Sequence, residues 1–190
     1  ADYSAEVGVL SSAGGDALAV LGYLDQGGNQ IIQGSLDSGA FDTFVLSDGM
    51  IGDSLTDTFG SDLDNSFGSM PGSLGEGAQM FTKYAEENGV NPSVYVGESY
   101  DAAALIILAM QAGESTDKSS IAANIMNVAN GPGEKIMAGE LSKGLKLLAD
   151  GKSIDYQGAT DVSFTDVGEA FGLFIEKGIE NGKFVNVSQR

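Results

Sequence analysis

The sequence contains no histidine, no cysteine and no tryptophan, and the first two absences each remove a class of chemistry. Without histidine there is no Ser-His-Asp triad, no imidazole base and no HExxH zinc motif. Without cysteine there is no thiolate nucleophile, no disulfide framework and no iron–sulfur or zinc-thiolate site. The lack of cysteine fits the periplasm and is also compatible with the cytosol. These absences exclude catalytic and metal sites built on histidine or cysteine. We assign no catalytic residues, no metal and no cofactor from the sequence, although a pair of carboxylates among the 27 acids stays an open alternative.

Basic residues are scarce: 9 Lys+Arg stand against 27 Asp+Glu, a formal net charge of −18. A field of that sign repels phosphate groups, so we expect neither nucleic acid nor an anionic membrane surface as a partner. The longest apolar run, residues 102–110, has about half the length of a membrane span. The first residues, Ala1-Asp2-Tyr3, are neither basic nor apolar, so we expect no signal peptide within this stretch.

Glycine is abundant and proline is rare, with 28 and 3 of the 190 residues. Apolar residues make up 42% of the chain, which is enough for a buried core. The length corresponds to one domain or to two small ones. The glycines are scattered, so they exclude collagen and solenoid repeats and indicate short elements joined by sharp loops.

The amino-terminal third shows an alternation of helical stripes and apolar strands. Helices are expected at 4–13, 26–38 and 53–59, and strands buried on both faces at 17–21 and 41–46, with a third strand at 66–70. This β-α-β order predicts a parallel sheet.

The remainder is dominated by helical patterns and ends in a hairpin. Helices are expected at 78–88, 99–111, 120–129 and 141–149, and a hairpin from 171–176 and 183–187 around Glu180-Asn181-Gly182. The helix at 99–111 is apolar nearly all round, which predicts complete burial. We expect the chain to pass between two lobes at 70–72 and 166–169.

Two motifs are better explained by ordinary structure. The glycines of Gly72-Ser-Leu-Gly-Glu-Gly77 have the spacing G-x-x-G-x-G, which is not that of a dinucleotide-binding loop. The acidic run around Asp62 lacks the glycine and glutamate of a calcium-binding EF-hand, so a solvated loop is favoured.

Tyr23 and Asp48 stand out because each follows a predicted strand of the parallel sheet. Ligands of open α/β sheets bind at the carboxyl ends of the strands. There a carboxylate can pair with an ammonium group, and a tyrosine ring can form a wall. The alternatives are that Asp48 caps a turn or the following helix, and that Tyr23 is a rim residue.

Three segments resemble the periplasmic branched-chain amino-acid-binding protein family. They are Ala17–Tyr23 with Phe44–Met50, then Tyr95–Ala103, and most specifically Ile154-Asp-Tyr-Gln-Gly-Ala-Thr160 followed by Val162-Ser-Phe164. The last is similar to the family tail Y-x-G-A-x-G-x-(V/I)-x-F. The segments occur in the family's order and span nearly the whole chain.

The resemblance implies an α/β fold with Rossmann-like βαβ lobes, the type I periplasmic-binding-protein fold, present here only in part. Residues 1–70 would belong to the second lobe, 71–166 to a helix-rich part of the first lobe, and 167–190 to a hairpin returning to the second. On this match Asp48 would bind the α-ammonium of an amino acid, and Tyr23 and Tyr100 would line the cleft. Tyr100 also has a plain alternative as a core residue.

The function implied is that of a periplasmic solute-binding component of an ABC importer. It would bind an amino acid or a related small molecule without chemistry, and deliver it to a membrane permease. Two alternatives stay open: a ligand-sensing domain of a receptor or regulator, and an α/β enzyme without a recognisable motif.

The chain also departs from the family. Only the carboxyl-terminal half is matched, and Asp161 stands where the family usually has glycine. We expect the chain to be a fragment whose unpaired sheet edges lead to self-association or require a companion chain.

Overall fold

The computed structural model describes residues 2–190 and separates into two compact units. Unit 1 comprises Ala1–Pro71 and Phe174–Arg190, and unit 2 comprises Gly72–Leu173. The first crossing falls within the expected 70–72. The second lies beyond the expected 166–169, because the intervening segment folds back on itself: the Phe171 N–H donates to the Ser163 carbonyl at 2.8 Å, and Phe164 pairs with Ala170.

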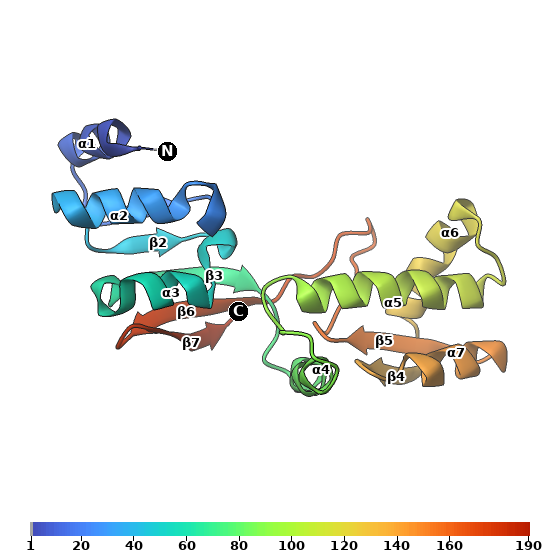
Figure 1. The fold of residues 1–190 in the computed structure, drawn as a ribbon. Coiled ribbons are helices and arrows are strands. Elements are labelled where there is room, and N and C mark those ends of the chain that lie inside the picture. Colours follow the sequence, from blue (N-terminus) through green and yellow to red (C-terminus); the bar gives the residue numbers. More distant parts are fainter. Residues whose placement is uncertain (1) are drawn as a thin grey trace. The chain divides into compact units, whose positions relative to one another are not determined.

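Unit 1 is built around a mixed sheet with the strand order β1-β2-β3-β6-β7 (Figure 1). Its elements are α1 Ser4–Ala13, β1 Leu18–Val20, the 3₁₀ helix η1 Leu24–Gln26, α2 Gly28–Ser38, β2 Phe44–Leu46, η2 Asp48–Met50, α3 Asp53–Phe59, η3 Gly60–Leu63, β3 Phe67–Pro71, β6 Phe174–Glu180 and β7 Lys183–Gln189. β1, β2 and β3 are parallel, as the βαβ pattern predicts, whereas β6 runs antiparallel to β3.

One face of this sheet carries the core of unit 1. Leu18 and Phe44 of the strands belong to one buried hydrophobic cluster with Ile32 of α2 and Leu55 of α3. Ile32, Phe44 and Leu55 are completely excluded from solvent. α2 ends at Gly39, which adopts the left-handed conformation (φ 65°) that favours glycine at this position.

The opposite face of the sheet is open, so the expectation that β1 and β2 are buried on both faces is wrong. Ala19 of β1 is exposed, and Leu21 just beyond it is 84% exposed. A cavity of about 300 Å³ lies on this face, with Val45, Phe67 and Phe174 among its lining residues. The reason is that α2 and α3 pack on only one side and α1 packs on α2, so no helix in the described part of unit 1 covers the second face.

The carboxyl-terminal hairpin is confirmed. β6 and β7 are antiparallel and joined by Asn181-Gly182, with φ angles of 52° and 70°. Positive φ at both central residues is the signature of the type I′ turn that Asn-Gly favours.

Unit 2 contains four helices and two strands in the described part of the chain. They are α4 Glu76–Glu87, α5 Val96–Ala112, α6 Lys118–Ala129, β4 Glu134–Met137, α7 Leu141–Ala149 and β5 Ile154–Gly158. The helices match the expected ones within a few residues. The strands β4 and β5 were not anticipated; they pair in parallel, and α7 connects them.

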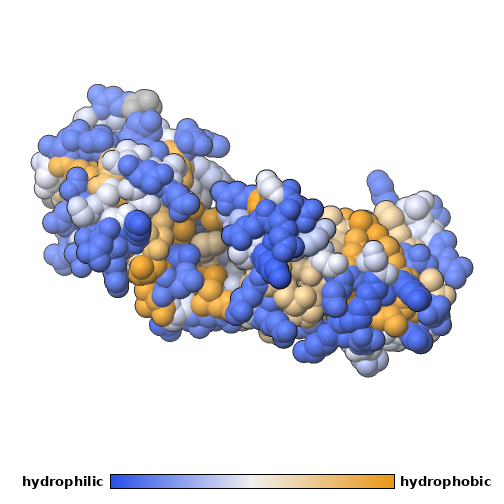
Figure 2. Space-filling model, turned by 60° about the horizontal axis from the view of Figure 1, so that its bottom comes forward, coloured by the Kyte–Doolittle hydropathy of each residue, from blue (hydrophilic) through white to orange (hydrophobic). Residues whose placement is uncertain are grey.

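The expectation that α5 is fully buried is wrong. Leu105 and Leu108 pack into the core of unit 2 with Ile136 of β4, while Ile106 and Ile107 on the other side are 41% and 40% exposed. Hydrophobic residues are also visible at the surface of both units in Figure 2. No helix within residues 2–190 has the length and hydrophobicity needed to cross a lipid bilayer.

Candidate functional site

The loops that follow β1 and β2 are tied to each other at the carboxyl ends of these parallel strands. The Gly22 N–H donates to the Ser47 hydroxyl at 3.2 Å, and that hydroxyl donates to the Gly22 carbonyl at 3.1 Å. Because of this reciprocal pair, Tyr23 and Asp48 occupy neighbouring loops at one edge of the sheet.

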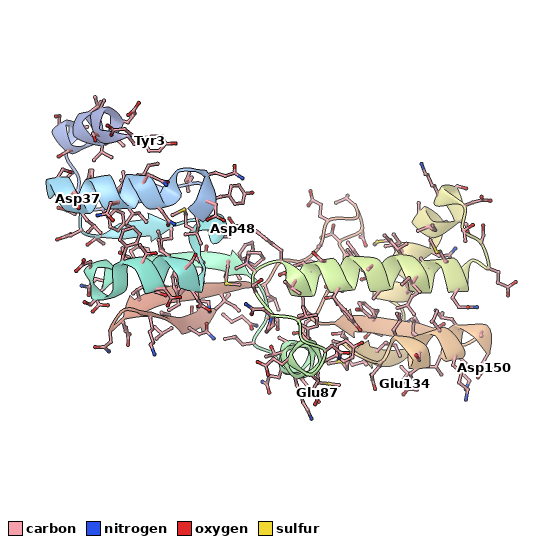
Figure 3. All side chains as sticks on the ribbon, in the orientation of Figure 1. Tyr3, Asp37, Asp48, Glu87, Glu134 and Asp150 are labelled. Atoms are coloured by element: carbon pink, nitrogen blue, oxygen red, sulfur yellow. The ribbon has the colours of Figure 1, made fainter. Side chains whose placement is uncertain are left out.

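Asp48 opens the short helix η2 at the end of β2 (Figure 3). Its Oδ1 accepts a hydrogen bond from the Gly49 N–H at 2.8 Å, and the side chain is half-buried. Within residues 2–190, Oδ2 has no hydrogen-bond partner. The following helix α3 has Gly52 as its N-cap and no side-chain cap, so Asp48 does not cap it. The carboxylate therefore stabilises the turn that begins at Asp48 through Oδ1, and Oδ2 stays available to bind a ligand.

Tyr23 lies against the same turn. Its side chain is 55% exposed, and a Cβ atom added to Gly49 would lie 2.7 Å from its ring and 2.5 Å from the Gly22 carbonyl oxygen. Only glycine permits this close approach at position 49. Tyr23 and Asp48 thus flank the Gly49 backbone, and the structure brings these two predicted site residues together.

The amino terminus of α2 belongs to the same neighbourhood. The N–H groups of Gln26 and Gly28 both donate to the Tyr23 carbonyl at 3.1 Å. The Oδ1 atom of Asn29, in the first turn of α2, is buried without a hydrogen-bond partner among the described residues. Asn29 and Ser47 were not singled out from the sequence. Ser47 directly follows β2, and this position could have indicated it. Asn29 lies in α2, nine residues after β1, and no comparable signal marks it.

Tyr100 belongs to unit 2, where its surroundings are those of a packed residue. Its ring centroid lies 5.4 Å from that of Phe81 and 6.0 Å from that of Tyr84. Its hydroxyl accepts a hydrogen bond from the Gly139 N–H at 2.8 Å, and burial raises the pKa of the hydroxyl. These contacts favour the alternative of a core residue, and the ligand-binding role of Tyr100 stays a prediction.

The best-organised polar group of unit 2 is Asp101, which the sequence analysis did not select although it follows Tyr100. Its side chain is 2% exposed. It accepts hydrogen bonds from the Tyr156 hydroxyl (2.7 Å), the Ala159 N–H (2.8 Å), the Thr160 N–H (2.8 Å) and the Thr160 hydroxyl (2.7 Å). Burial raises the pKa of the Asp101 carboxyl, although these hydrogen bonds act in the opposite direction.

Asp101 explains the Tyr-Gln-Gly-Ala-Thr motif in physical terms. Gly158 has a φ of 62°, and a Cβ atom there would overlap the Asp101 carboxylate. The tyrosine and threonine supply donors and the glycine supplies space. The motif is therefore a turn that surrounds a buried carboxylate. Separately, no group of side chains suited to binding a metal ion occurs within residues 2–190.

Comparison with known proteins supports the fold and not a specific activity. No protein family matches the sequence in a scan, and no characterised protein matches it in a sequence search. Solved structures do match. A leucine-binding protein, LivK, from Thermotoga maritima has 19% identity and a TM-score of 0.72, over 99% of this chain and 48% of that one.

Two further structures give the same result. A type 1 periplasmic binding protein from Bordetella pertussis has 18% identity and a TM-score of 0.68, over 98% of this chain and 49% of that one. A branched-chain amino acid ABC transporter protein from Thermus thermophilus, solved with bound valine, has 12% identity and a TM-score of 0.64, over 99% of this chain and 49% of that one.

The chain spans about half the length of these neighbours. The α/β fold expected from the resemblance is confirmed, as is its partial character. The chain has the fold of about half of a type I periplasmic binding protein.

Proposed function

We propose that this chain is part of a solute-binding protein of an ABC importer, which binds an amino acid or a related small molecule without chemical conversion. The observation that carries the proposal is the edge of the unit 1 sheet. At the carboxyl ends of two parallel strands, Asp48 keeps one carboxylate oxygen available, and the Tyr23 ring lies against the adjacent Gly49. The structural neighbours include a leucine-binding protein and one solved with valine, which supports an amino-acid ligand.

The proposed chemistry is the pairing of an ammonium group with the Asp48 carboxylate. A hydrogen bond between charged groups contributes about 1.5–3 kcal/mol, and closure of a cleft around it removes competing water. The Tyr23 ring would shield the pair from one side. Tyr100 is proposed as a cleft residue only through the resemblance.

The location and the partners follow from the same proposal. A binding protein of this type works in the periplasm and delivers its ligand to a membrane permease. The open face of the unit 1 sheet, with Leu21 84% and Phe174 48% exposed, supports the further proposal that this chain self-associates or acts with a companion segment.

The function is tested by isothermal titration calorimetry with L-leucine on the natural polypeptide that carries this sequence. We expect Asp48→Asn to weaken binding at least tenfold, in line with the loss of about 1.4 kcal/mol or more. Asp57→Asn, which changes an exposed acid of α3, is the matched control and should leave the affinity unchanged.

Two results would contradict the proposal at different levels. An unchanged affinity after Asp48→Asn would reject Asp48 as the ammonium ligand. A wild-type polypeptide that binds neither leucine nor any other amino acid would reject the binding function. For the 190-residue chain alone, with half of the fold, we expect weak binding or none.

A further inference from the structure

The segment that follows the first crossing is held by a carboxylate far away in the sequence. Ser73 is 7% exposed, and its hydroxyl donates a short hydrogen bond to Oδ2 of Asp161. The same hydroxyl accepts a hydrogen bond from the Gly75 N–H at 2.9 Å. Ser73 therefore links the backbone just before α4 to the turn that follows β5.

The glycines of this segment allow the approach. A Cβ atom on Gly75 would lie 2.5 Å from Oδ2 of Asp161, and one on Gly77 would overlap the Gly158 carbonyl oxygen. These two glycines of the G-x-x-G-x-G motif thus serve close packing. Because α4 begins at Glu76, the Asp161 carboxylate lies at the amino terminus of this helix, where a negative charge is favourable.

Asp161 occupies a conformation that ordinarily favours glycine. Its φ is 54°, in the left-handed region, where a side chain costs about 1–2 kcal/mol relative to right-handed backbone. Aspartate tolerates this region better than most residues, and its carboxylate reaches the Ser73 hydroxyl from here. The side chain thus compensates for a local backbone cost.

The other side of the same turn is also held. The N–H group of Thr160, the residue before Asp161, donates to the buried Asp101 carboxylate of α5 at 2.8 Å. The turn is consequently fixed on α5 through Asp101 and fixes the start of α4 through Asp161. All of these residues belong to unit 2.

We infer that Asp161 is a positioning residue for the joint between the two units. By holding Ser73, it makes the chain from Ser73 onward part of the rigid body of unit 2. Movement of one unit relative to the other is then absorbed at Pro71-Gly72 and Leu173-Phe174. At this joint the Gly72 N–H donates to the Leu173 carbonyl at 3.0 Å, and Gly72 has a φ of 146°. The relevance of this joint to ligand capture rests on the proposed binding function.

The inference is tested by amide hydrogen exchange of the full chain, which needs no ligand. We expect Ser73→Ala and Asp161→Gly each to speed exchange of the amides of residues 75–79 by about tenfold or more, because each removes a hydrogen bond to a charged group. The amides of β4 and β5 serve as the internal reference and should stay unchanged. Asp161→Asn keeps an acceptor for the Ser73 hydroxyl and should give an intermediate rate.

Two controls separate the tether from other effects. Asn181→Gly relieves a left-handed residue in the β6–β7 turn without removing a tether, and should leave residues 75–79 unchanged. The double variant Ser73→Ala/Asp161→Gly should speed exchange by less than the product of the two single increases, because both variants remove the Ser73–Asp161 contact. Additive effects, or slower exchange at residues 75–79 in Asp161→Gly, would overturn the inference.

A titration with L-leucine distinguishes the inference from the proposed function. If the natural polypeptide binds leucine, Asp161→Gly should change its affinity, whereas Asn181→Gly should not. An affinity unaltered by Asp161→Gly, despite faster exchange, would overturn the role at the joint. Faster exchange in a polypeptide that binds no amino acid would support the tether and contradict only the binding function.

Discussion

The hydroxyl of Tyr156 donates to the carboxylate of Asp101 at 2.7 Å, and these side chains are 1% and 2% exposed. The two residues are 55 positions apart and come from β5 and α5. Within residues 2–190 no basic side chain forms an ion pair with Asp101, so its charge is balanced by hydrogen-bond donors alone. The cost of burying such a carboxylate is offset only by its hydrogen bonds, so the loss of any one donor should lower the stability of the chain.

Removing the Tyr156 hydroxyl should therefore destabilise the chain. We expect Tyr156→Phe to lower the free energy of unfolding by about 1–3 kcal/mol, because a buried charge loses one of its donors. Chemical denaturation monitored by circular dichroism measures this. Tyr84→Phe, at a tyrosine that is 41% exposed, is the control and should change little. Equal stabilities of the two variants would show that the hydrogen bond from Tyr156 to Asp101 does not stabilise the chain.

Replacing Asp101 by asparagine tests the network from the acceptor side. In Asp101→Asn one oxygen becomes an NH₂ group and faces hydrogen-bond donors of the turn. We expect a loss of about 2 kcal/mol or more in the free energy of unfolding, together with faster amide exchange at Ala159 and Thr160. A variant as stable as the wild type, with protected amides at these two positions, would contradict the network.

Two carboxyl groups, those of the half-buried Glu98 and the buried Asp101, should make the free energy of unfolding depend on pH. We expect it to fall as pH rises above the ordinary pKa values of glutamate and aspartate. Burial raises the pKa of Glu98 above its ordinary 4.5 and that of Asp101 above 3.8. The folded chain therefore holds these protons at pH values where the unfolded chain has lost them. As pH rises from the pKa of the unfolded state to that of the folded state, each group lowers the free energy of unfolding. Above the folded-state pKa the group is ionised in both states, and this loss of stability is complete.

Glu98→Gln removes one of these titrations. In thermal unfolding between acidic and neutral pH, we expect this variant to lose less stability than the wild type as pH rises. Glu86→Gln, at an exposed position of α4, is the matched control and should follow the wild-type curve. A Glu98→Gln curve parallel to that of the wild type would contradict the prediction.

Gly49 should not tolerate a side chain. In Gly49→Ala the new Cβ atom would meet the Gly22 carbonyl oxygen and the Tyr23 ring, so we expect a loss of about 1–3 kcal/mol and a displaced Tyr23. Gly34→Ala in α2 is the matched control, because no atom lies within 4 Å of its added Cβ atom. It should stabilise by up to about 1 kcal/mol, since alanine is the better helix former. If Gly49→Ala is as stable as Gly34→Ala, the packing described for the site is incorrect.

The open face of the unit 1 sheet should drive self-association of the isolated chain. Phe67 and Phe174 are 45% and 48% exposed there. We expect Phe67→Thr/Phe174→Thr to lower the average mass in sedimentation velocity while keeping the strand content, because threonine also favours strands. Val167→Thr changes an exposed loop residue of unit 2 and should have no effect. A wild-type chain that stays monomeric at high concentration would contradict the prediction.

Much of unit 1 could be predicted from the sequence because its elements are local and well delimited. The apolar runs at 17–21 and 41–46 end at glycine or at a Ser-Asp-Gly turn, and they became β1 and β2. The burial of these strands on one face only could not be predicted, because an apolar run does not reveal whether a second layer is present. For the same reason α5 was expected to be buried on all sides.

The candidate site was predicted in part. Tyr23 and Asp48 could be selected because each follows a strand, and parallel strands end at the same edge of a sheet. Asn29 and Ser47 were missed because their importance depends on hydrogen bonds, made or missing, in the folded chain. The strands β4 and β5 were missed because they are only four and five residues long and contain no continuous apolar run: their sequences are Glu-Lys-Ile-Met and Ile-Asp-Tyr-Gln-Gly.

The sequence by itself determined which chemistries are excluded, the parallel βαβ order of residues 17–71, and the hairpin at Asn181-Gly182. These properties depend on composition or on neighbouring residues. Only the tertiary structure decided that Asp101 organises the turn after β5 and that Asp161 holds Ser73, 88 positions away. Those contacts join segments distant in the chain, and they exist only because the packing of β5, α4 and α5 brings the donors and acceptors within hydrogen-bond distance.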